Sequence, residues 1–200
     1  MLAAAFQEEL IEAGCDEAGR GCLAGPVFAA AVILPPGFSH PLLDDSKRMK
    51  ERDRDTLRGV IERQAVAWAV AQVDAQRIDH INILNASIEA MNDAAAMLGV
   101  RPGLLLVDGN RFRTALDIPF KCIVGGDGLY ANIAAASVLA KTHRDEYMRS
   151  LSEEFPYYKW DKNKGYPTRD HRMAISCHGL TPHHRLSFNH TAGQLSLFGE

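Results

Sequence analysis

Short apolar segments separated by polar ones run along the whole chain and predict five β-strands. They occupy residues 10–15, 27–34, 65–73, 104–107 and 120–124. In the third segment the large apolar residues Val66, Trp68 and Val70 alternate with small ones, which is typical of a strand. The first two segments are expected to form a hairpin. The second of these is almost wholly apolar and should be buried.

Longer segments predict helices over residues 50–64, 81–98, 129–154 and 167–178. In 81–98 apolar residues recur every three or four positions, which gives a helix one buried face; they are Ile81, Leu84, Ile88, Met91, Ala95 and Leu98. Gly99 ends this helix, and Pro167 is expected in the first turn of the last one. The order of the elements predicts an α/β fold with helices flanking a mixed five-stranded sheet.

Three of the predicted strands end on carboxylates. Asp16 and Glu17 follow the first strand, Asp108 follows the fourth, and Asp127 comes shortly after the fifth. Open sheets place ligand sites at strand ends, and clustered carboxylates repel one another unless a cation is present. Oxygen ligands favour Mg²⁺ or Mn²⁺, and two such ions support phosphoryl transfer. Acids that only lie in solvated turns are the alternative, which the residues alone leave open.

The loop after the first strand bears on whether its two acids can meet one ion. Successive strand residues point to opposite faces, so Asp16 and Glu17 are expected to converge only if the strand ends and the backbone bends there. Gly19 and Gly21 permit such a bend. Cys15, one residue earlier, should turn away from Asp16.

Composition and charge indicate one ordinary globular domain. The chain has 200 residues, of which 46% are hydrophobic and 24% charged, and its net charge is −3. Residues 1–140 carry 13 Lys/Arg against 18 Asp/Glu, whereas residues 141–190 carry 9 against 6 and six of the eight histidines. A polyanionic ligand is therefore expected to dock on the C-terminal quarter.

Neither a membrane anchor nor a zinc centre is predicted. The short apolar N-terminus has no basic flank and runs into Glu8 and Glu9, unlike a signal peptide, and no apolar run reaches membrane-spanning length. The four cysteines show no C-x-x-C spacing, and Cys177 with the nearby histidines matches no standard zinc site. Free thiols and a cytoplasmic location are the expectation.

Ordered motifs extend over about residues 9–190. The first is Cys-Asp-Glu-Ala-Gly-Arg-Gly at 15–21, followed by Leu-Ala-Gly-Pro at 23–26. Asp-Ser-Lys at 45–47, Val-Asp-Gly-Asn at 107–110 and Gly-Gly-Asp at 125–127 come next. Further blocks lie at 134–141, 144–145, 164–168 and 183–188. In this order the motifs resemble those of the type 2 ribonucleases H, specifically bacterial ribonuclease HII.

The resemblance implies a ribonuclease H-like fold with a C-terminal helical extension. It also implies an endonuclease that cuts RNA in RNA–DNA hybrids and DNA on the 5′ side of single embedded ribonucleotides. Two Mg²⁺ or Mn²⁺ ions, bound with the substrate, would support a hydrolysis that leaves 5′-phosphate and 3′-hydroxyl ends. The implied catalytic and metal-binding carboxylates are Asp16, Glu17, Asp108 and Asp127. Asp145 is a rival to Asp127, but it lies mid-helix beside Arg144, where an ion pair is expected.

Substrate contacts are implied for five residues. Gly19, Arg20 and Gly21 resemble the loop that contacts the backbone around the ribonucleotide, its amides reading the 2′-hydroxyl that distinguishes RNA from DNA. Tyr166 matches the tyrosine that stacks near the ribose at the junction. Lys47 is expected to contact a phosphate.

Other basic and aromatic residues have more than one interpretation. Lys141 and Arg144 share a helix face and either follow a nucleic-acid strand or lie in solvent. Residues 157–166 interleave aromatic and basic side chains, a combination that suits base stacking and phosphate contact. Within that segment, core packing is the stronger expectation for Tyr157 and Trp160.

One motif lies outside the catalytic match, near the end of the chain. Gln194, Leu195, Leu197 and Phe198 form a Gln-Leu-x-Leu-Phe pattern. It resembles the peptide by which bacterial replication and repair proteins bind the sliding clamp. A terminus that frays or packs is the alternative.

The prediction is a monomer with a ribonuclease H-like core at 1–145, a basic helical extension at 146–190 that completes the substrate site, and a flexible tail at 191–200. Ribonuclease HIII is the competing enzyme, and Tyr166 argues against it. A non-catalytic hybrid-binding or clamp-tethered module is a third interpretation, which would leave four intact acids idle.

Overall fold

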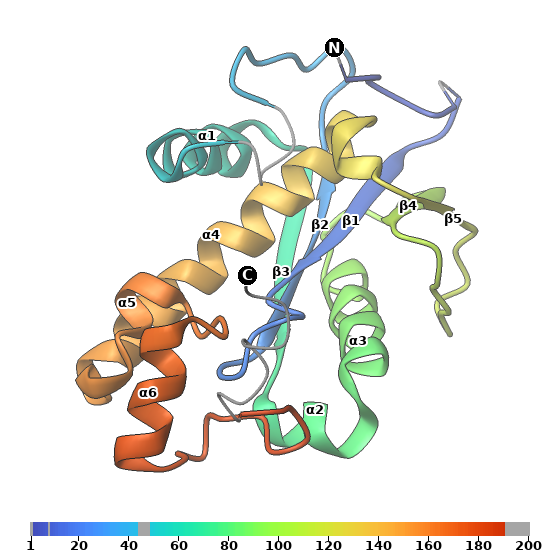
Figure 1. Cartoon of the computed structure of the whole chain (residues 1–200). Helices are drawn as coiled ribbons and strands as arrows, with labels where there is room; N and C mark the ends of the chain where they lie inside the picture. The colour runs from blue at the N-terminus through green and yellow to red at the C-terminus, as the bar shows by residue number, and fades with distance from the viewer. Residues whose placement is uncertain (1, 8, 44–48, 191–200) are drawn as a thin grey trace, which may run out of the picture.

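Five strands form one mixed sheet in the order β3-β2-β1-β4-β5 (Figure 1). The computed structural model describes residues 2–7, 9–43 and 49–190. The strands are β1 (Glu12–Ala18), β2 (Val27–Ile33), β3 (Ala67–Val73), β4 (Leu104–Asp108) and β5 (Phe120–Ile123). β2 pairs antiparallel with both β1 and β3, whereas β4 is parallel to β1 and to β5. The predicted mixed sheet of five strands is confirmed.

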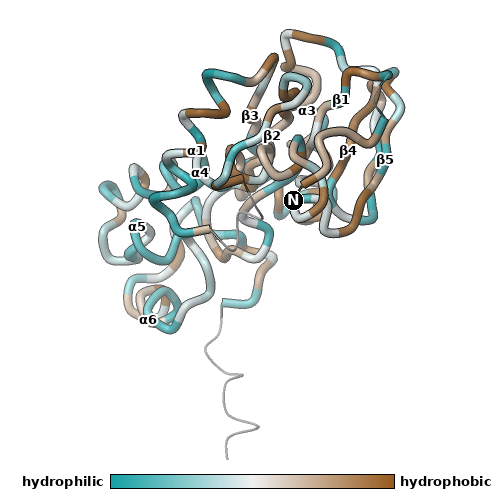
Figure 2. The backbone as a smooth tube through the Cα atoms, turned by 90° about the horizontal axis from the view of Figure 1, so that it is seen from above, coloured by the Kyte–Doolittle hydropathy of each residue, from teal (hydrophilic) through white to brown (hydrophobic). Residues whose placement is uncertain are grey.

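Helices cover both faces of this sheet. α3 (Ile83–Ala96) packs on one face, and α1 (Glu51–Gln64) and α4 (Ala131–Glu154) pack on the other. The remaining helical segments are α2 (Ala75–Ile81), η1 (Gly126–Gly128), η2 (Pro156–Tyr158), α5 (Trp160–Asn163) and α6 (Arg169–His178). Figure 2 shows apolar residues gathered along the strands and more hydrophilic ones on α5 and α6. No helix in the described part of the chain is long and apolar enough to cross a membrane.

The first strand differs from its prediction in a way that matters for function. β1 continues to Ala18, so Asp16 and Glu17 lie within it and pair with Ala30 and Ala29 of β2. The expectation that the strand ends before these acids is wrong. An apolar sequence indicates which residues are buried, but the length of a strand depends on its backbone hydrogen bonds. β2 pairs with β1 beyond the apolar segment, so β1 continues through the acids.

Two helix boundaries also differ from their predictions. Asn82, with φ 67°, separates α2 from α3, and its side-chain oxygen accepts a hydrogen bond from the Asn85 backbone N–H at 3.1 Å, as favoured at an N-cap. Pro167 precedes α6 instead of lying in its first turn, because Thr168 is the N-cap and accepts from the His171 N–H at 3.2 Å. The predicted apolar face of 81–98 does pack against the sheet.

α4 is the element at which the sheet and the C-terminal helices meet. Its backbone lies so close to β1 that a Cβ built on Gly14 would be 2.1 Å from the carbonyl carbon of Asn132. Its second half packs Met148 and Leu151 in one cluster with Trp160. The boundary predicted at residue 145 falls within this continuous helix, and the division into core and extension stays a prediction.

Candidate active site

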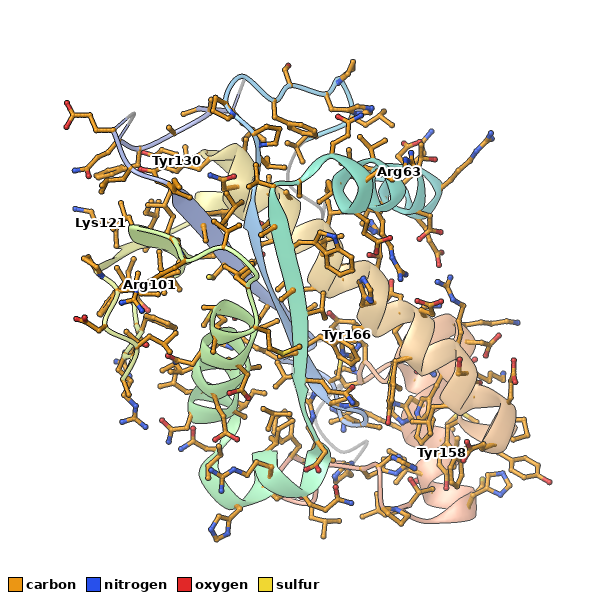
Figure 3. All side chains as sticks on the ribbon, turned by 180° about the vertical axis from the view of Figure 1, so that it is seen from behind. Arg63, Arg101, Lys121, Tyr130, Tyr158 and Tyr166 are labelled. Atoms are coloured by element: carbon orange, nitrogen blue, oxygen red, sulfur yellow. The ribbon has the colours of Figure 1, made fainter. Side chains whose placement is uncertain are left out.

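A cleft of about 580 Å³ opens where β1, β4 and α4 meet the loop after β1. We call it the ribose cleft, after the sequence prediction that its loop and Tyr166 contact a ribose. Its lining includes most of the residues that the sequence singled out: Asp16, Glu17, Gly19, Arg20, Gly21, Asp108 and Tyr166. Arg54, Ser137 and Lys141 also line it. Figure 3 shows Tyr166 near the centre of the molecule beside α4, whereas Tyr158 lies among the C-terminal helices.

Asp16 and Glu17 reach this cleft from opposite faces of the sheet. Asp16 pairs with Ala30, which packs with α1 and α4, whereas Glu17 pairs with Ala29, which packs with α3. Asp108 ends the adjacent parallel strand β4. The three acids therefore approach one another because β1 and β4 lie side by side, and no bend in β1 is needed.

The electrostatics of Asp16 favour a bound cation. Only 4% of the residue is exposed, and this burial raises the pKa of its carboxyl well above the ordinary 3.8. The nearby carboxylates of Glu17 and Asp108 raise the pKa further, against the opposing effect of hydrogen bonds from the Ser137 side chain and the Glu17 backbone N–H. A divalent cation would offset this repulsion and keep Asp16 ionised.

The donor set fits Mg²⁺ or Mn²⁺, although the protein forms no complete cage. Over residues 2–7, 9–43 and 49–190, no three His, Cys, Asp or Glu side chains are grouped so that they could hold a metal ion. Mg²⁺ is usually bound by one or two carboxylates together with waters and substrate phosphate oxygens. Asp16, Glu17 and Asp108 offer oxygen ligands of this kind, and the open cleft beside them leaves room for a substrate.

Cys15 does not contribute to this donor set. It packs in the core on the α3 side of the sheet, as predicted from strand alternation. Burial, with a smaller effect from the neighbouring Asp16 carboxylate, raises the pKa of its thiol to about 12. The thiol is therefore protonated at neutral pH and is a poor ligand.

Asp127 lies beside the ribose cleft but outside its lining. It belongs to η1, just before α4, and is 4% exposed. The preceding residue, Gly126, donates its backbone N–H to Asp108 Oδ1 at 2.7 Å. The residue just before Asp127 therefore contacts the acid group directly, and the role of Asp127 as a fourth ligand stays a prediction.

Lys141 and Arg144 have different environments. Lys141 lines the ribose cleft, with its Nζ 2.6 Å from Asp145 Oδ1 and 5.8 Å from the centre of the Tyr166 ring. The expected ion pair of Asp145 is present, but its partner is Lys141. Arg144 is fully buried, so both interpretations of it, as a strand contact and as a solvated side chain, are wrong.

Two buried arginines hold the loop between β1 and β2. Both donate to backbone carbonyl oxygens. Those bound by Arg144 belong to Lys164 (2.9 Å), Pro26 (3.0 Å) and Ala24 (3.1 Å). Those bound by Arg185 belong to Gly25 (2.9 Å) and Arg20 (3.0 Å). Burial, and then the nearby Arg144 charge, lower the pKa of Arg185 to about 10. Sequence reasoning missed this role, and the only signal was that each arginine lay within a matched motif block.

The glycines of this loop serve two different needs. Gly19, with φ 97°, leaves room for Arg144, whose Nε would be 2.0 Å from a Cβ at that position. A Cβ at Gly21 would meet nothing within 4 Å, so its backbone faces open space. The Arg20 side chain between them is half exposed and pairs with Glu17 at 3.0 Å.

A buried hydrogen-bond chain of two histidines supports Tyr166 from behind. Trp160 Nε1 donates to His171 Nε2 at 3.0 Å, so the His171 proton lies on Nδ1, which is 2.9 Å from the Tyr166 carbonyl oxygen. The Thr181 backbone N–H donates to His184 Nδ1 at 2.9 Å, which leaves the His184 proton on Nε2, 3.3 Å from His171 Nε2. Both rings are therefore neutral, and protonation of either would bring two donors together.

Other predictions for the C-terminal segment have mixed outcomes. Trp160 is fully buried as expected, whereas Tyr157 is 66% exposed and stacks on His178 with 4.5 Å between ring centres. Tyr158 occupies the core position instead. Lys47 and the peptide of Gln194, Leu195, Leu197 and Phe198 lie outside the described residues.

Comparison with known proteins identifies the family of this chain. The family model for Ribonuclease HII matches residues 13–191. The chain belongs to the ribonuclease HII family. A Ribonuclease HII from Bacteroides fragilis is 60% identical over 201 residues, which cover 100% of each chain. Family membership makes the chain a ribonuclease H, an endonucleolytic hydrolase of RNA–DNA hybrids, and excludes both ribonuclease HIII and the non-catalytic module.

Solved structures of related enzymes share the fold. The PCNA:RNase HII complex from Archaeoglobus fulgidus gives a TM-score of 0.72 at 23% identity and covers 90% of this chain and 96% of that one. Bst-RNase HIII in complex with Mn²⁺ gives a TM-score of 0.66 at 17% identity and covers 90% of this chain and 67% of that one. The ribonuclease H-like fold expected for a member of the ribonuclease HII family is therefore confirmed.

The histidine chain predicts a pH dependence of stability. Burial, and then the neighbouring imidazoles of His171 and His190, lower the pKa of His184 from 6.5 to about 3. Between these two values the unfolded chain binds the proton and the folded chain does not, so the free energy of unfolding should fall as the pH falls from 6.5 towards 3. Urea unfolding of the wild type and of His184→Asn at a series of pH values measures the effect.

The variant should lose up to about 1.4 kcal/mol per pH unit of this slope. Carboxylates titrate in the same window in both proteins, so only the difference between their slopes is informative. His80→Asn, which changes an exposed histidine of α2, serves as the control and should keep the wild-type slope. Equal slopes for wild type and His184→Asn would contradict the neutral histidine chain.

Proposed function

We propose that the chain cuts duplex DNA on the 5′ side of single embedded ribonucleotides, in addition to cutting RNA in hybrids, and leaves 5′-phosphate and 3′-hydroxyl ends. The observation that carries this proposal is the ribose cleft, in which the acids, the Gly-Arg-Gly loop and Tyr166 meet. Selecting one ribonucleotide requires a contact to its 2′-hydroxyl. Hydrolysis requires acids at the neighbouring phosphate, and the cleft contains groups suited to both tasks.

Each recognition residue has a stated task under this proposal. The open space at Gly21 lets a ribose approach the loop backbone, where an amide can bind the 2′-hydroxyl. Tyr166 is 39% exposed at the cleft and packs its ring against the sugar. Arg20 and Lys141 offset the charge of the flanking phosphates. Lys47 is proposed to contact a further phosphate.

The proposed cofactors are two Mg²⁺ or Mn²⁺ ions, held together with the substrate by Asp16, Glu17, Asp108 and Asp127. When bound, such ions activate water and stabilise the departing oxygen. The raised pKa of Asp16 supports this proposal, and so does the Mn²⁺ complex of Bst-RNase HIII. Asp108 ends the strand next to β1, and Asp16 and Glu17 lie on opposite faces of β1. We therefore propose that the Asp108 carboxylate contributes to ion binding together with each of them.

If the acids hold the ions, the variant Asp108→Asn should lose nearly all cleavage. Asparagine keeps the shape of the side chain but removes its charge, so incision of a duplex with one ribonucleotide should fall by about 10³-fold or more. EDTA should abolish the wild-type activity. Gel shifts should show that the variant still binds the duplex. The exposed Asp117 provides the control Asp117→Asn, which should cleave normally. Incision by Asp108→Asn within tenfold of wild type would contradict the assignment.

Tyr166 is predicted to affect selectivity more than general hydrolysis. Tyr166→Ala removes the ring that packs against the ribose, so kcat/KM for a single-ribonucleotide duplex should fall about tenfold more than kcat/KM for a long hybrid. Tyr157→Ala, which removes an exposed tyrosine of the same segment, is the matched control and should leave both values unchanged. Equal losses on the two substrates in Tyr166→Ala would remove its selective role.

We also infer that the C-terminal peptide binds a bacterial sliding clamp, and that the chain acts as a cytoplasmic monomer. The archaeal relative solved in complex with PCNA supports a clamp partner, and the free state of all four cysteines suits a reducing compartment. The peptide is Gln194, Leu195, Leu197 and Phe198.

Alanine at both Leu197 and Phe198 should weaken clamp binding about tenfold or more, because these apolar side chains would anchor the peptide. Ser196→Ala, at the variable position between them, is the control. Calorimetry with the purified clamp measures affinity, and turnover on a short duplex without clamp should stay unchanged in both variants. Unaltered affinity in the double variant would contradict clamp binding by this peptide.

A further inference from the structure

A second cleft, of about 290 Å³, opens on the other side of the same acids. We call it the α3 cleft. It shares Glu17, Arg20 and Asp108 with the ribose cleft, so the two clefts meet along the acids. Its other walls come from α3 and from the turn after β4, and include Ser87 and Arg111. A strand that crosses the acids from the ribose cleft would enter the α3 cleft.

Ser87 carries an unpaired hydroxyl in the lining of the α3 cleft. The residue is 1% exposed, and its hydroxyl has no hydrogen-bond partner among the described residues. Buried hydroxyls in folded proteins are nearly always bonded, because an unpaired one lowers stability. Ser87 lines the α3 cleft, so a ligand there could supply the missing partner.

The remaining walls indicate what kind of ligand fits. Leu84 of α3 is partly exposed at the cleft, with the buried Ile88 and Met91 beside it, and this apolar wall suits the face of a sugar ring. Arg111 is exposed, and no hydrogen bond or ion pair joins its guanidinium to another residue in the part of the chain that the structure describes. An arginine, a hydroxyl and an apolar surface together match a nucleotide, whose phosphate and sugar account for most protein–DNA hydrogen bonds.

We propose that the α3 cleft binds the deoxynucleotide on the 5′ side of the bond that is cut. Arg111 pairs with that nucleotide's 5′ phosphate, and the Ser87 hydroxyl donates to an oxygen of its sugar–phosphate. This inference rests on the proposed function, because Tyr166 at the ribonucleotide places the ribose cleft on the 3′ side of the scissile phosphate. The nucleotide across the acids is then the 5′ neighbour.

Arg111 is tested by neutralising one phosphate at a time. A single-ribonucleotide duplex carries one methylphosphonate, either at the 5′ phosphate of that neighbour or at a phosphate 3′ of the ribonucleotide. Arg111→Gln should lower kcat/KM about tenfold on the unmodified duplex. The 5′ methylphosphonate should cost the wild type a similar factor and the variant nothing further, because the same contact has already been lost. The 3′ modification should lower kcat/KM by the same factor in both enzymes.

The control Arg101→Gln changes an exposed arginine (Figure 3) that lines neither cleft, and it should respond like the wild type throughout. If the 5′ methylphosphonate lowers kcat/KM of Arg111→Gln by the same factor as it lowers that of the wild type, the proposed contact is wrong. Failure of the wild type to incise the unmodified duplex would instead contradict the proposed function, so the two failures are distinguishable.

Ser87→Ala separates a substrate contact from a structural one. The variant should melt at or above the wild-type temperature, because an unpaired hydroxyl has been removed, and yet its kcat/KM should fall several-fold. A lower melting temperature, or unchanged cleavage, would overturn the assignment of Ser87. The 5′ methylphosphonate should also cost Ser87→Ala a smaller factor than it costs the wild type if the hydroxyl binds that phosphate, and an equal factor if it binds the sugar.

Discussion

The loop between β1 and β2 depends on two buried guanidinium groups that donate hydrogen bonds to backbone carbonyl oxygens. Arg144 and Arg185 together bind five such oxygens, and a buried charge without this compensation would be strongly destabilising. The carbonyls come from the loop itself and from the segment before Tyr166, so both must be in place together. Backbone hydrogen bonds reinforce the arrangement, with Leu23 N–H donating to the Gly165 carbonyl at 2.8 Å and Gly25 N–H to the His183 carbonyl at 2.8 Å. The segments that follow α5 and α6 are therefore part of the loop's structure.

This dependence links hydrolysis to recognition. Asp16, Glu17 and Asp108 lie on β1 and β4, inside the sheet, whereas the residues proposed to contact the ribose lie on the loop and on the segment of Tyr166. The two sets meet because the loop leaves β1 after Ala18, one residue beyond Glu17, and hydrogen-bonds to the C-terminal segment. The histidine chain through His171 then holds the Tyr166 carbonyl. The proposed ribose and phosphate contacts would thus be held at a constant separation, which suits the proposed incision at one ribonucleotide among many deoxyribonucleotides.

Much of the fold could be predicted from the sequence, because the apolar segments indicate which strands are buried. The acids near the ends of these strands indicate that they lie at the same edge of the sheet. Periodicity placed the inner face of α3 correctly. It could not show that β1 continues through Glu17, because backbone pairing with β2 sets that boundary. Nor could it show that Arg144 is buried, because an arginine enters a core only where tertiary contacts supply acceptors. The exchange of Tyr157 for Tyr158 in the core has the same origin, since a 3₁₀ turn sets which of two neighbouring rings faces inward.

The residues of α4 that contact the cleft and the loop lie on one face of the helix. Ser137 meets Asp16, Lys141 lines the cleft, Arg144 holds the loop and Met148 packs with the C-terminal helices. Their spacings of four, three and four residues keep them in one helical phase. One inserted residue between any two would rotate the later ones by about 100° and break the alignment between the acids and the loop held by Arg144. The number of residues between Ser137 and Met148 is therefore fixed by the geometry of the site, because an insertion or deletion there would misalign everything that follows it in α4.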